Sequence, residues 1–307
     1  MKKISTSLVF FVMRRPKATK RVINVLKNFK FKKVYIICDS WRNESEKSKV
    51  LKVRKIVSKS FQNQKIKKLF YDKNIGMRNI APVAFKEIFK FEDKIIVIED
   101  DTIPSPSFFN FADKLLLKYK KNKKISMISA VNFNTKMTKE NKEDYFFSRY
   151  SFLWGWATWR DRWKIYDNSL KKWDFYKKSG RLKKDFPIKG EYRFWKKELN
   201  SLQRNQSKGA WDFPLSFANY YYNRFSIVPK VNLVKNIGLS DDPTGRNPKK
   251  IKKLKINYIK NKIIHPKKIF RNLEYDNYCG HYHYYLGTFF VRLKNKVCKY
   301  LKILKFL

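Results

Sequence analysis

The chain has 307 residues, enough to bury one large hydrophobic core or two smaller ones, and its 43% hydrophobic and 17% aromatic content exclude disorder as its default state. Its 72 Lys and Arg residues against 25 Asp and Glu give a net charge of +47, typical of a lysine-rich surface, an anionic-membrane binder or a nucleic-acid binder. Because the basic residues are spread over nearly every segment and no nucleic-acid-binding motif is present, no nucleic acid is expected as a partner.

The N-terminal residues MKKISTSLVFFVMRRP begin with basic residues and continue with an apolar stretch. That stretch is about seven residues long and lacks a small-residue cleavage site, so it is interpreted as a first strand and not as a signal peptide. No apolar run approaches the ~20 residues that a transmembrane helix needs. Three cysteines without CxxC spacing fit a reducing compartment. We therefore expect a cytoplasmic protein, at most peripheral on the inner face of the cell membrane.

Apolar strand-like runs alternate with helical patterns over roughly the first 130 residues, which predicts an α/β fold with a mostly parallel sheet and helices on both faces. Strands are expected at Ser7–Met13, Val34–Cys38, Lys67–Tyr71, Ile95–Ile98 and Ile125–Val131. Helices are expected at Lys17–Lys30, Glu46–Ser60, Met77–Phe89 and Pro106–Tyr119.

The alternation stops after Asn132, and an aromatic block, YFFSRYSFLWGWATWRDRW, covers Tyr145–Trp163. Further helices are expected at Glu191–Leu202 and from Gly209 through Tyr222. Ser226–Val234 contains Pro229 and is expected to be an edge strand. With no flexible linker visible, we expect residues 1–131 and 132–247 to be two halves of one domain, followed by a basic C-terminal extension over 248–307.

Three successive carboxylates, Glu99, Asp100 and Asp101, follow the buried strand Ile95–Ile98. Ligands of open α/β sheets bind at the carboxyl ends of parallel strands. Clustered carboxylates repel each other unless a cation, hydrogen-bond donors or solvent separates their charges. A hard divalent metal that also holds a diphosphate would meet that need, although a solvated acidic turn would have the same sequence.

Four segments in order resemble nucleotide-sugar glycosyltransferases of the GT-A fold, the group similar to N-acetylglucosaminyltransferase I and bacterial surface-polysaccharide enzymes. The segments are VIEDD at Val97–Asp101, WGWATWRDRW at Trp154–Trp163, WDFPLSFA at Trp211–Ala218 and SIVPKVNLVKNIG at Ser226–Gly238. The resemblance spans roughly residues 4–245 and rests on this order more than on the EDD triplet, a short and common pattern.

This resemblance implies a role for each matching position. Asp101 would contact Mn²⁺ (or Mg²⁺) on the donor diphosphate, Asp100 would face the ribose or sugar, and Glu99 would support the turn. A UDP-sugar is the favoured donor and a surface polysaccharide or lipid-linked glycan the expected acceptor. The remaining nucleotide contacts would come from Arg14, Arg15, Asp39, Asn74 and Arg78. Asp212 matches the position of the base that deprotonates the acceptor hydroxyl in inverting relatives, and a retaining route stays open.

Several of these positions have a purely structural alternative. Asp212 would serve equally as an N-cap. Tryptophans mainly bury area, so sugar contact by Trp154, Trp156 and Trp211, with Gly155 allowing close backbone approach, competes with packing. Relatives often carry a histidine after the NIG segment; here the loop reads LSDDPTGRNP, and Arg246 is the candidate phosphate contact in its place.

Two segments near the C-terminus complete the predictions. His281-Tyr282-His283 has no accompanying Cys or acid cluster and is interpreted as a surface aromatic stretch. Apolar residues recur at helical spacing with lysines between them, which predicts either an amphipathic helix on an anionic bilayer or a helix packed on the domain. These apolar residues are Phe290, Leu293, Val297, Leu301 and Leu304.

Two other functions remain open from the sequence. A non-catalytic polyanion or nucleic-acid binder would not need the carboxylate triplet or the Trp-Asp segment. A nucleotidyltransferase also holds a metal and a nucleotide with acids after a strand, but its first loop is usually glycine-rich. The corresponding loop here, Met13 to Pro16, contains no glycine.

Overall fold

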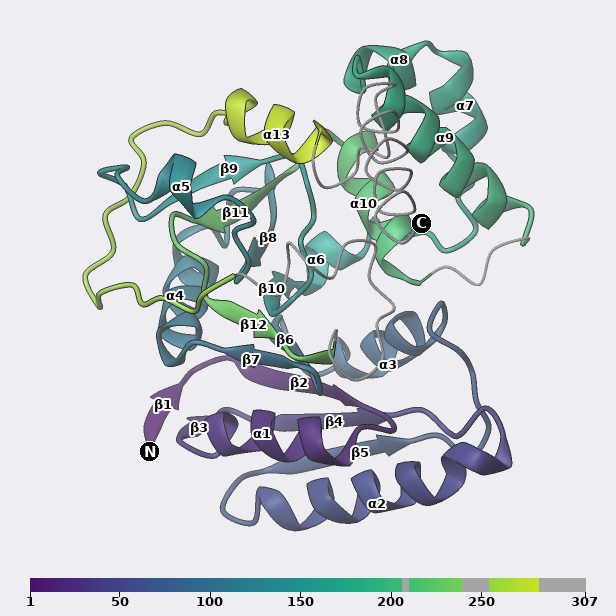
Figure 1. The fold of residues 1–307 in the computed structure, drawn as a ribbon, viewed down its shortest axis with the longest axis vertical. Helices are drawn as coiled ribbons and strands as arrows, with labels where there is room; N and C mark the ends of the chain where they lie inside the picture. The colour runs from purple at the N-terminus through teal and green to yellow at the C-terminus, as the bar shows by residue number, and fades with distance from the viewer. Residues whose placement is uncertain (206–209, 239–253, 282–307) are drawn as a thin grey trace, which may run out of the picture. The chain divides into compact units, whose positions relative to one another are not determined.

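A computed structural model describes residues 1–205, 210–238 and 254–281 (Figure 1). The chain divides into two compact units, one formed by residues 1–168 and 209–272 and the other by residues 169–208 and 273–307. The expected α/β class is confirmed, because the first unit contains a large mixed sheet flanked by helices.

The first unit contains the strands and most of the helices of the described residues. Its strands are β1 (Lys2–Ile4), β2 (Ser7–Val12), β3 (Phe29–Phe31), β4 (Val34–Cys38), β5 (Ile66–Phe70), β6 (Lys94–Glu99), β7 (Thr102–Pro104), β8 (Ile125–Ser129), β9 (Tyr145–Ser148), β10 (Trp156–Trp159), β11 (Phe225–Pro229) and β12 (Val234–Asn236). Its helices are α1 (Pro16–Leu26), α2 (Glu44–Ser60), α3 (Ile80–Ile88), α4 (Pro106–Lys118), α5 (Thr135–Thr138), α6 (Arg160–Trp163) and α10 (Asp212–Tyr221).

The main sheet has eight strands in the order β5-β4-β2-β6-β10-β8-β11-β9. Strands β5, β4, β2 and β6 are all parallel, as the alternation of strands and helices requires. Beyond them β10 pairs antiparallel with both β6 and β8 and so separates these two strands. Because β2, β4 and β6 are parallel, the loops that follow these three strands lie at the same edge of the sheet.

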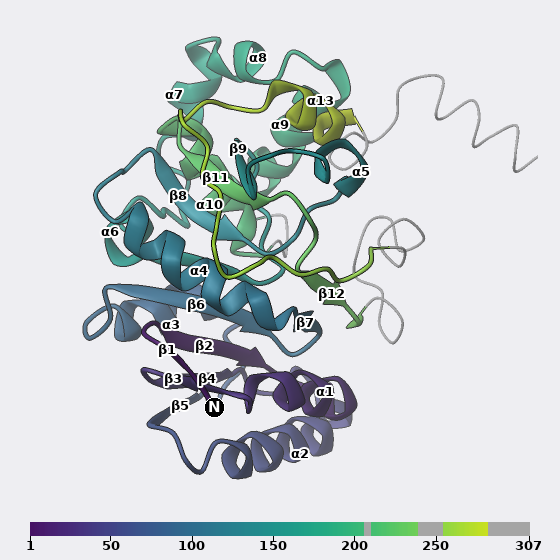
Figure 2. The same ribbon diagram turned by 90° about the vertical axis from the view of Figure 1, so that its left-hand side faces the viewer.

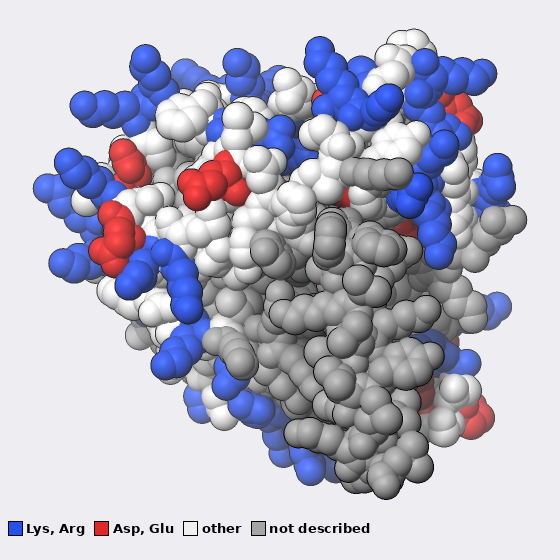
Figure 3. All heavy atoms as spheres, turned by 45° about the horizontal axis from the view of Figure 1, so that its top comes forward, with Lys and Arg blue, Asp and Glu red and all other residues white. Residues whose placement is uncertain are grey.

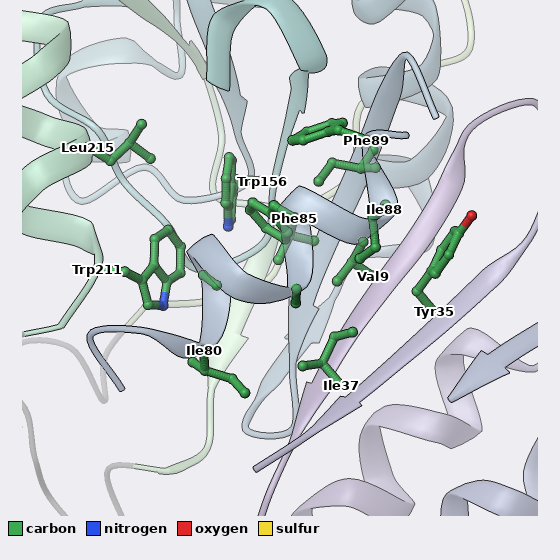
Figure 4. Close-up of a cluster of buried hydrophobic side chains, with 14 of the residues drawn as sticks. Val9, Tyr35, Ile37, Ile80, Phe85, Ile88, Phe89, Trp156, Trp211 and Leu215 are labelled. Carbon is green, nitrogen blue, oxygen red and sulfur yellow. The ribbon is translucent and has the colours of Figure 1, made fainter. Parts of the chain in front are cut away.

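Each face of the parallel strands buries alternate residues against helices. Val9, Tyr35, Ile37 and Val97 point toward α3 and the start of α10, in a cluster that also contains Trp156 (Figure 4). On the other face, Phe10 packs edge-on against Phe61 at the end of α2, with ring centroids 6.4 Å apart. These strands are apolar without alternation because both of their faces are covered.

Strand β11 corrects one expectation about the sheet. It lies between β8 and β9 and is not an edge strand. Pro229 is accommodated because it is the last residue of β11, where the pairing with Tyr145 ends. The run expected to be one strand over 226–234 is divided between β11 and β12, and β12 pairs with β7 in a separate two-stranded sheet.

The second unit consists of helices among the residues described. They are α7 (Trp173–Lys178), α8 (Arg181–Asp185), α9 (Lys189–Gln203) and α13 (Leu273–Cys279). Trp173 Nε1 donates to Asn200 Oδ1 at 2.8 Å and links α7 to α9. Phe186 and Trp195 pack with ring centroids 5.8 Å apart. The helix expected at Glu191–Leu202 lies within α9.

Basic side chains (blue) lie around much of the rim of the view in Figure 3, and Asp and Glu (red) are few. This distribution follows from the spread of lysines along the sequence. Within the described ranges, none of the helices combines the length and the apolar character that crossing a bilayer would require.

Candidate active site

The candidate site begins with two aspartates in the turn between β6 and β7. Asp100 Oδ2 accepts the Met13 backbone N–H at 3.1 Å, and Asp100 Oδ1 accepts Arg15 Nη1 at 3.3 Å. The same Arg15 nitrogen lies 3.2 Å from Asp101 Oδ2. Met13 and Arg15 follow β2, which pairs with β6 in parallel, so two adjacent strand ends bring the acids and the arginine together.

Burial makes this acidic turn electrostatically costly. It raises the pKa of Asp100 to about 6, helped by the neighbouring charge of Asp101 and opposed by Arg15. The pKa of Glu99 is raised for the same reason, and the charges of Asp101, Asp100 and Asp212 add to it. Within the part of the chain that the structure describes, Arg15 contacts both aspartates, and a divalent ion would lower these pKa values further.

Asp101 has an oxygen that no described residue satisfies. The residue is 8% exposed, and its Oδ1 is buried without a hydrogen-bond donor. A buried carboxylate oxygen without a partner loses its hydration without compensation, so the site favours a cation there. Carboxylate oxygens are the donors that Mg²⁺ and Mn²⁺ prefer, so the residues fit such an ion.

The protein supplies few ligands for that ion. No group of three or more His, Cys, Asp or Glu side chains suited to a metal occurs in the part of the chain that the structure describes. Mg²⁺ in phosphate-transfer sites is commonly held by one or two carboxylates together with the substrate phosphates. A metal at Asp101 would accordingly bind together with a diphosphate and weakly by itself.

The NIG segment (Asn236–Gly238) packs directly on Asp101. The Ile237 N–H donates to the Asp101 backbone oxygen at 2.7 Å, and Gly238 N–H donates to Asn236 Oδ1 at 2.9 Å. A Cβ on Gly238 would lie 2.8 Å from Asp101 Cβ, closer than side chains tolerate, so only glycine fits against this carboxylate. Arg246, the candidate phosphate contact, lies outside the described residues.

Asp39, at the end of β4, holds a loop. Its Oδ1 accepts the backbone N–H groups of Ser40 at 2.8 Å and Ile75 at 3.0 Å, and its Oδ2 accepts the Gly76 N–H at 2.9 Å. Asn74 Nδ2 donates to the Ser40 backbone oxygen at 2.6 Å. These contacts fix the 74–76 segment beside the strand ends, and the predicted nucleoside contact by Asp39 stays a prediction.

Arg14 joins a second charged cluster at the same edge. Its Nη1 donates to Glu46 Oε1 at 2.9 Å, and Arg42 contacts both oxygens of the same carboxylate. The hydrogen bonds from Arg42, with the charge of Arg14, lower the pKa of Glu46 to about 2. Glu46 thus positions two guanidinium groups, and the three side chains together carry one net positive charge, which suits an anionic ligand.

We expect Glu46→Gln to lower the free energy of unfolding by about 1–2 kcal/mol at pH 7, with the solvent screening of Arg14 and Arg42 taken into account. The pKa of Glu46 is below its ordinary value of 4.5, so this stabilisation is present above pH 4.5 and is lost as the pH falls toward 2. Urea unfolding at pH 7, 4 and 3 would show the difference shrinking. Glu44→Gln, in the same helical turn and 77% exposed, is the control without effect. An equal difference at every pH would contradict the assignment.

Asp212 begins α10 and accepts the Phe213 N–H at 3.0 Å through Oδ1. Burial raises the pKa of Glu99 and of Tyr166, and the charge of Asp212 adds to both shifts, so Asp212 lies within electrostatic range of both side chains. The N-cap expectation is wrong, because Trp211 occupies the N-cap of α10 and Asp212 is the first helical residue, bonded to the adjacent Phe213 N–H. The base role of Asp212 stays a prediction.

Arg78 is fixed near Tyr166. Its Nε donates to Asn168 Oδ1 at 3.1 Å and its Nη2 to the Asn168 backbone oxygen at 2.7 Å. The Tyr166 hydroxyl donates to the same Oδ1 at 3.3 Å, and its ring stacks on Trp163 with centroids 4.5 Å apart. Arg78 and Asp212 thus lie close to one aromatic side chain, which sequence reasoning did not identify.

The tryptophans divide into buried and accessible ones. Trp156 is fully buried and Trp211 is 5% exposed, and their rings stack with centroids 5.5 Å apart. The structure gives these two a packing role beneath the site. Trp154 is only partly buried, against Phe133, and Gly155 has a φ of +66° at the turn before β10. Sugar contact by any of them stays a prediction.

The sequence signals for the remaining site residues were indirect. Gly238, Glu46, Tyr166 and Asn168 carry no motif by themselves, although Gly238 ends a segment that the resemblance had already marked. The amphipathic stretch 290–304 and His283 lie outside the described residues, and nothing here bears on them.

No protein-family model and no curated protein matches the chain. Among solved structures, one of GalNAc-T7 with UDP, GalNAc and Mn²⁺ covers 74% of the chain at 11% identity with a TM-score of 0.46. The mannosyltransferase PcManGT from Pyrobaculum calidifontis, in complex with GDP-Man and Mn²⁺, covers 53% at 8% identity with a TM-score of 0.36. S. aureus TarS 1–349 covers 78% at 14% identity with a TM-score of 0.41.

The chain spans 43%, 47% and 62% of the lengths of these three structures, respectively. At such identities and TM-scores the likeness is too weak to assign a function.

Proposed function

We propose that the chain is a metal-dependent GT-A-type glycosyltransferase that moves a sugar from a nucleoside-diphosphate donor to a hydroxyl of a glycan, such as a surface polysaccharide or lipid-linked glycan. The observation that carries this proposal is the buried, unpartnered Oδ1 of Asp101 in a cluster of three acids at a strand end. The order of sequence motifs around it supports the same reading.

The donor would bind where β2, β4 and β6 end. Arg15 and the Arg14–Glu46–Arg42 cluster present positive charge there, which suits the phosphates of a nucleoside diphosphate. A divalent ion held by Asp101 and the diphosphate would neutralise the charge that develops on the leaving phosphate oxygen. Asp100 is held by Met13 and Arg15, so it is oriented and would bind donor hydroxyls.

The acceptor hydroxyl would approach Asp212. An ionised carboxylate there accepts the hydroxyl proton as the oxygen attacks the anomeric carbon and the bond to the diphosphate breaks. A single displacement of this kind inverts the anomeric configuration.

A thermal-shift experiment tests the proposal with UDP, GDP, CMP and dTDP, each with and without Mn²⁺. We expect one nucleotide to stabilise the protein only with Mn²⁺, by about 2.7 kcal/mol at a hundred times its dissociation constant, and Mn²⁺ alone to have little effect. Release of the nucleoside diphosphate from the matching sugar nucleotide would then be measured.

Each competing function predicts a different result. A nucleotidyltransferase would be stabilised by a nucleoside triphosphate and would release inorganic diphosphate. A polyanion binder would not be stabilised by any nucleotide, and it would bind heparin with an affinity that falls as the salt concentration rises. Either pattern would exclude the glycosyltransferase proposal.

A further inference from the structure

Residues 254–272 form an extended segment without regular structure, called the strap here, which crosses α4 in Figure 2 as a yellow-green trace. Its backbone is anchored at several points. The Ile259 N–H donates to Ser107 Oγ at 3.2 Å, and Lys114 Nζ donates to the Asn261 backbone oxygen at 2.7 Å. Ile264 and Asp144 exchange two hydrogen bonds, of 2.8 and 2.9 Å.

The strap exposes apolar side chains although its backbone is held in place. Tyr258 is 60% exposed, Ile264 53% and Phe270 68%, whereas Ile259 is buried. Leu117, on the helix that the strap crosses, is 70% exposed. Lys114 contacts the strap directly, and burial together with the charge of Lys118 lowers the pKa of His265 in the strap, so this part of α4 and the strap form one continuous surface.

The same surface is strongly basic. Between residues 254 and 272 the sequence contains no Asp or Glu and six basic residues, namely Lys255, Lys260, Lys262, Lys267, Lys268 and Arg271. Lysines interleaved with exposed isoleucine, tyrosine and phenylalanine match a surface with negative headgroups above an apolar layer. A soluble polyanion would match the lysines and leave the apolar side chains unused.

We propose that the strap and the adjoining face of α4 dock the protein on an anionic phospholipid surface. The lysines and arginine would contact lipid phosphates while Tyr258, Ile264 and Phe270 enter the headgroup boundary. This inference goes beyond the proposed transfer reaction and does not depend on it, because binding is measured without donor or acceptor.

Co-sedimentation with vesicles of phosphatidylcholine, with and without phosphatidylglycerol, tests the proposal on the full chain. A protein with a net charge of +47 is attracted to anionic vesicles through many parts of its surface. The comparison is therefore made between variants that remove the same number of charges. Lys260→Gln/Lys262→Gln/Lys267→Gln removes three charges from the strap. Lys52→Gln/Lys55→Gln/Lys59→Gln removes three exposed lysines from α2, away from the strap. We expect the strap variant to lose roughly 100-fold in affinity and the α2 variant only a few-fold.

A second pair of variants tests the apolar contribution. Ile264→Ser/Phe270→Ser should weaken vesicle binding roughly tenfold and remove the part that survives high salt. Leu51→Ser/Phe91→Ser, at exposed sites elsewhere, should not. Equal losses for the strap and α2 lysine variants, or no loss for either, would overturn the proposal. It would also be overturned if the chain bound heparin but not vesicles, or if the apolar variant bound vesicles as the wild type does.

Discussion

Asp101→Asn is expected to lower kcat/KM about 10³-fold and to abolish the Mn²⁺-dependent stabilisation by nucleotide. The substitution keeps the shape of the side chain but removes the charge that would hold a divalent ion at the buried Oδ1. The chain should still fold, because burial of Asp101 opposes its ionisation and the neutral amide relieves that cost. Initial rates with the identified sugar nucleotide and thermal shifts with and without Mn²⁺ give both readouts.

Two controls separate this result from a general effect of charge. Asp93→Asn removes an aspartate, 69% exposed, that precedes the opposite end of the same strand, and it should leave activity unchanged. Asp100→Asn should cost less than Asp101→Asn, since the Asp100 oxygens are already occupied by Met13 and Arg15. Activity of Asp101→Asn within a few-fold of the wild type, with Mn²⁺ dependence intact, would be incompatible with Asp101 as the metal contact.

Asp212→Asn is expected to lower kcat by about 10²–10⁴-fold while nucleotide affinity stays unchanged. Asparagine retains an oxygen that accepts the Phe213 N–H, so the start of α10 is preserved. What is lost is the capacity to take a proton from the acceptor hydroxyl. Measured on the acid side of the pH profile, the rate of the wild type should rise with increasing pH, and the rate of the variant should not show this rise.

The alternative role of Asp212 makes the opposite prediction. If Asp212 only begins the helix, Asp212→Asn should resemble the wild type and Asp212→Ala should lose stability by about 1 kcal/mol. Comparing the two variants in urea unfolding and in activity therefore distinguishes a base from a purely structural residue at the start of α10. Retained activity in Asp212→Asn would leave the reaction without its proposed base.

Local sequence pattern predicted the parallel half of the sheet well. Val34–Cys38 is a strand over the expected residues, and the run before Glu99 ends where the carboxylates begin. Runs of β-branched residues without alternation are typical of strands that are buried on both faces. The acids at the end of β6 and Asp39 after β4 could be placed at one sheet edge for the same reason.

Other features depended on contacts between residues far apart in the chain. The tryptophan block forms β10, which inserts antiparallel between β6 and β8 and buries Trp156 in the core. The aromatic residues of this strand show no periodicity that would indicate which strands it pairs with. The sequence therefore could not decide whether its tryptophans pack in the core or contact a sugar. For the same reason the sequence could not show that the strand ending at Pro229 lies between two other strands.

The sequence by itself determined the α/β class and the carboxylates at the end of β6, because both follow from hydrophobic pattern and residue type within short segments. Only the tertiary structure decided which groups surround Asp101. Arg15 reaches it from the end of β2 and Gly238 packs against it from the end of β12, 86 residues before and 137 after it in the chain. Those contacts depend on strand pairing and on close packing across the fold, which spacing along a sequence does not specify.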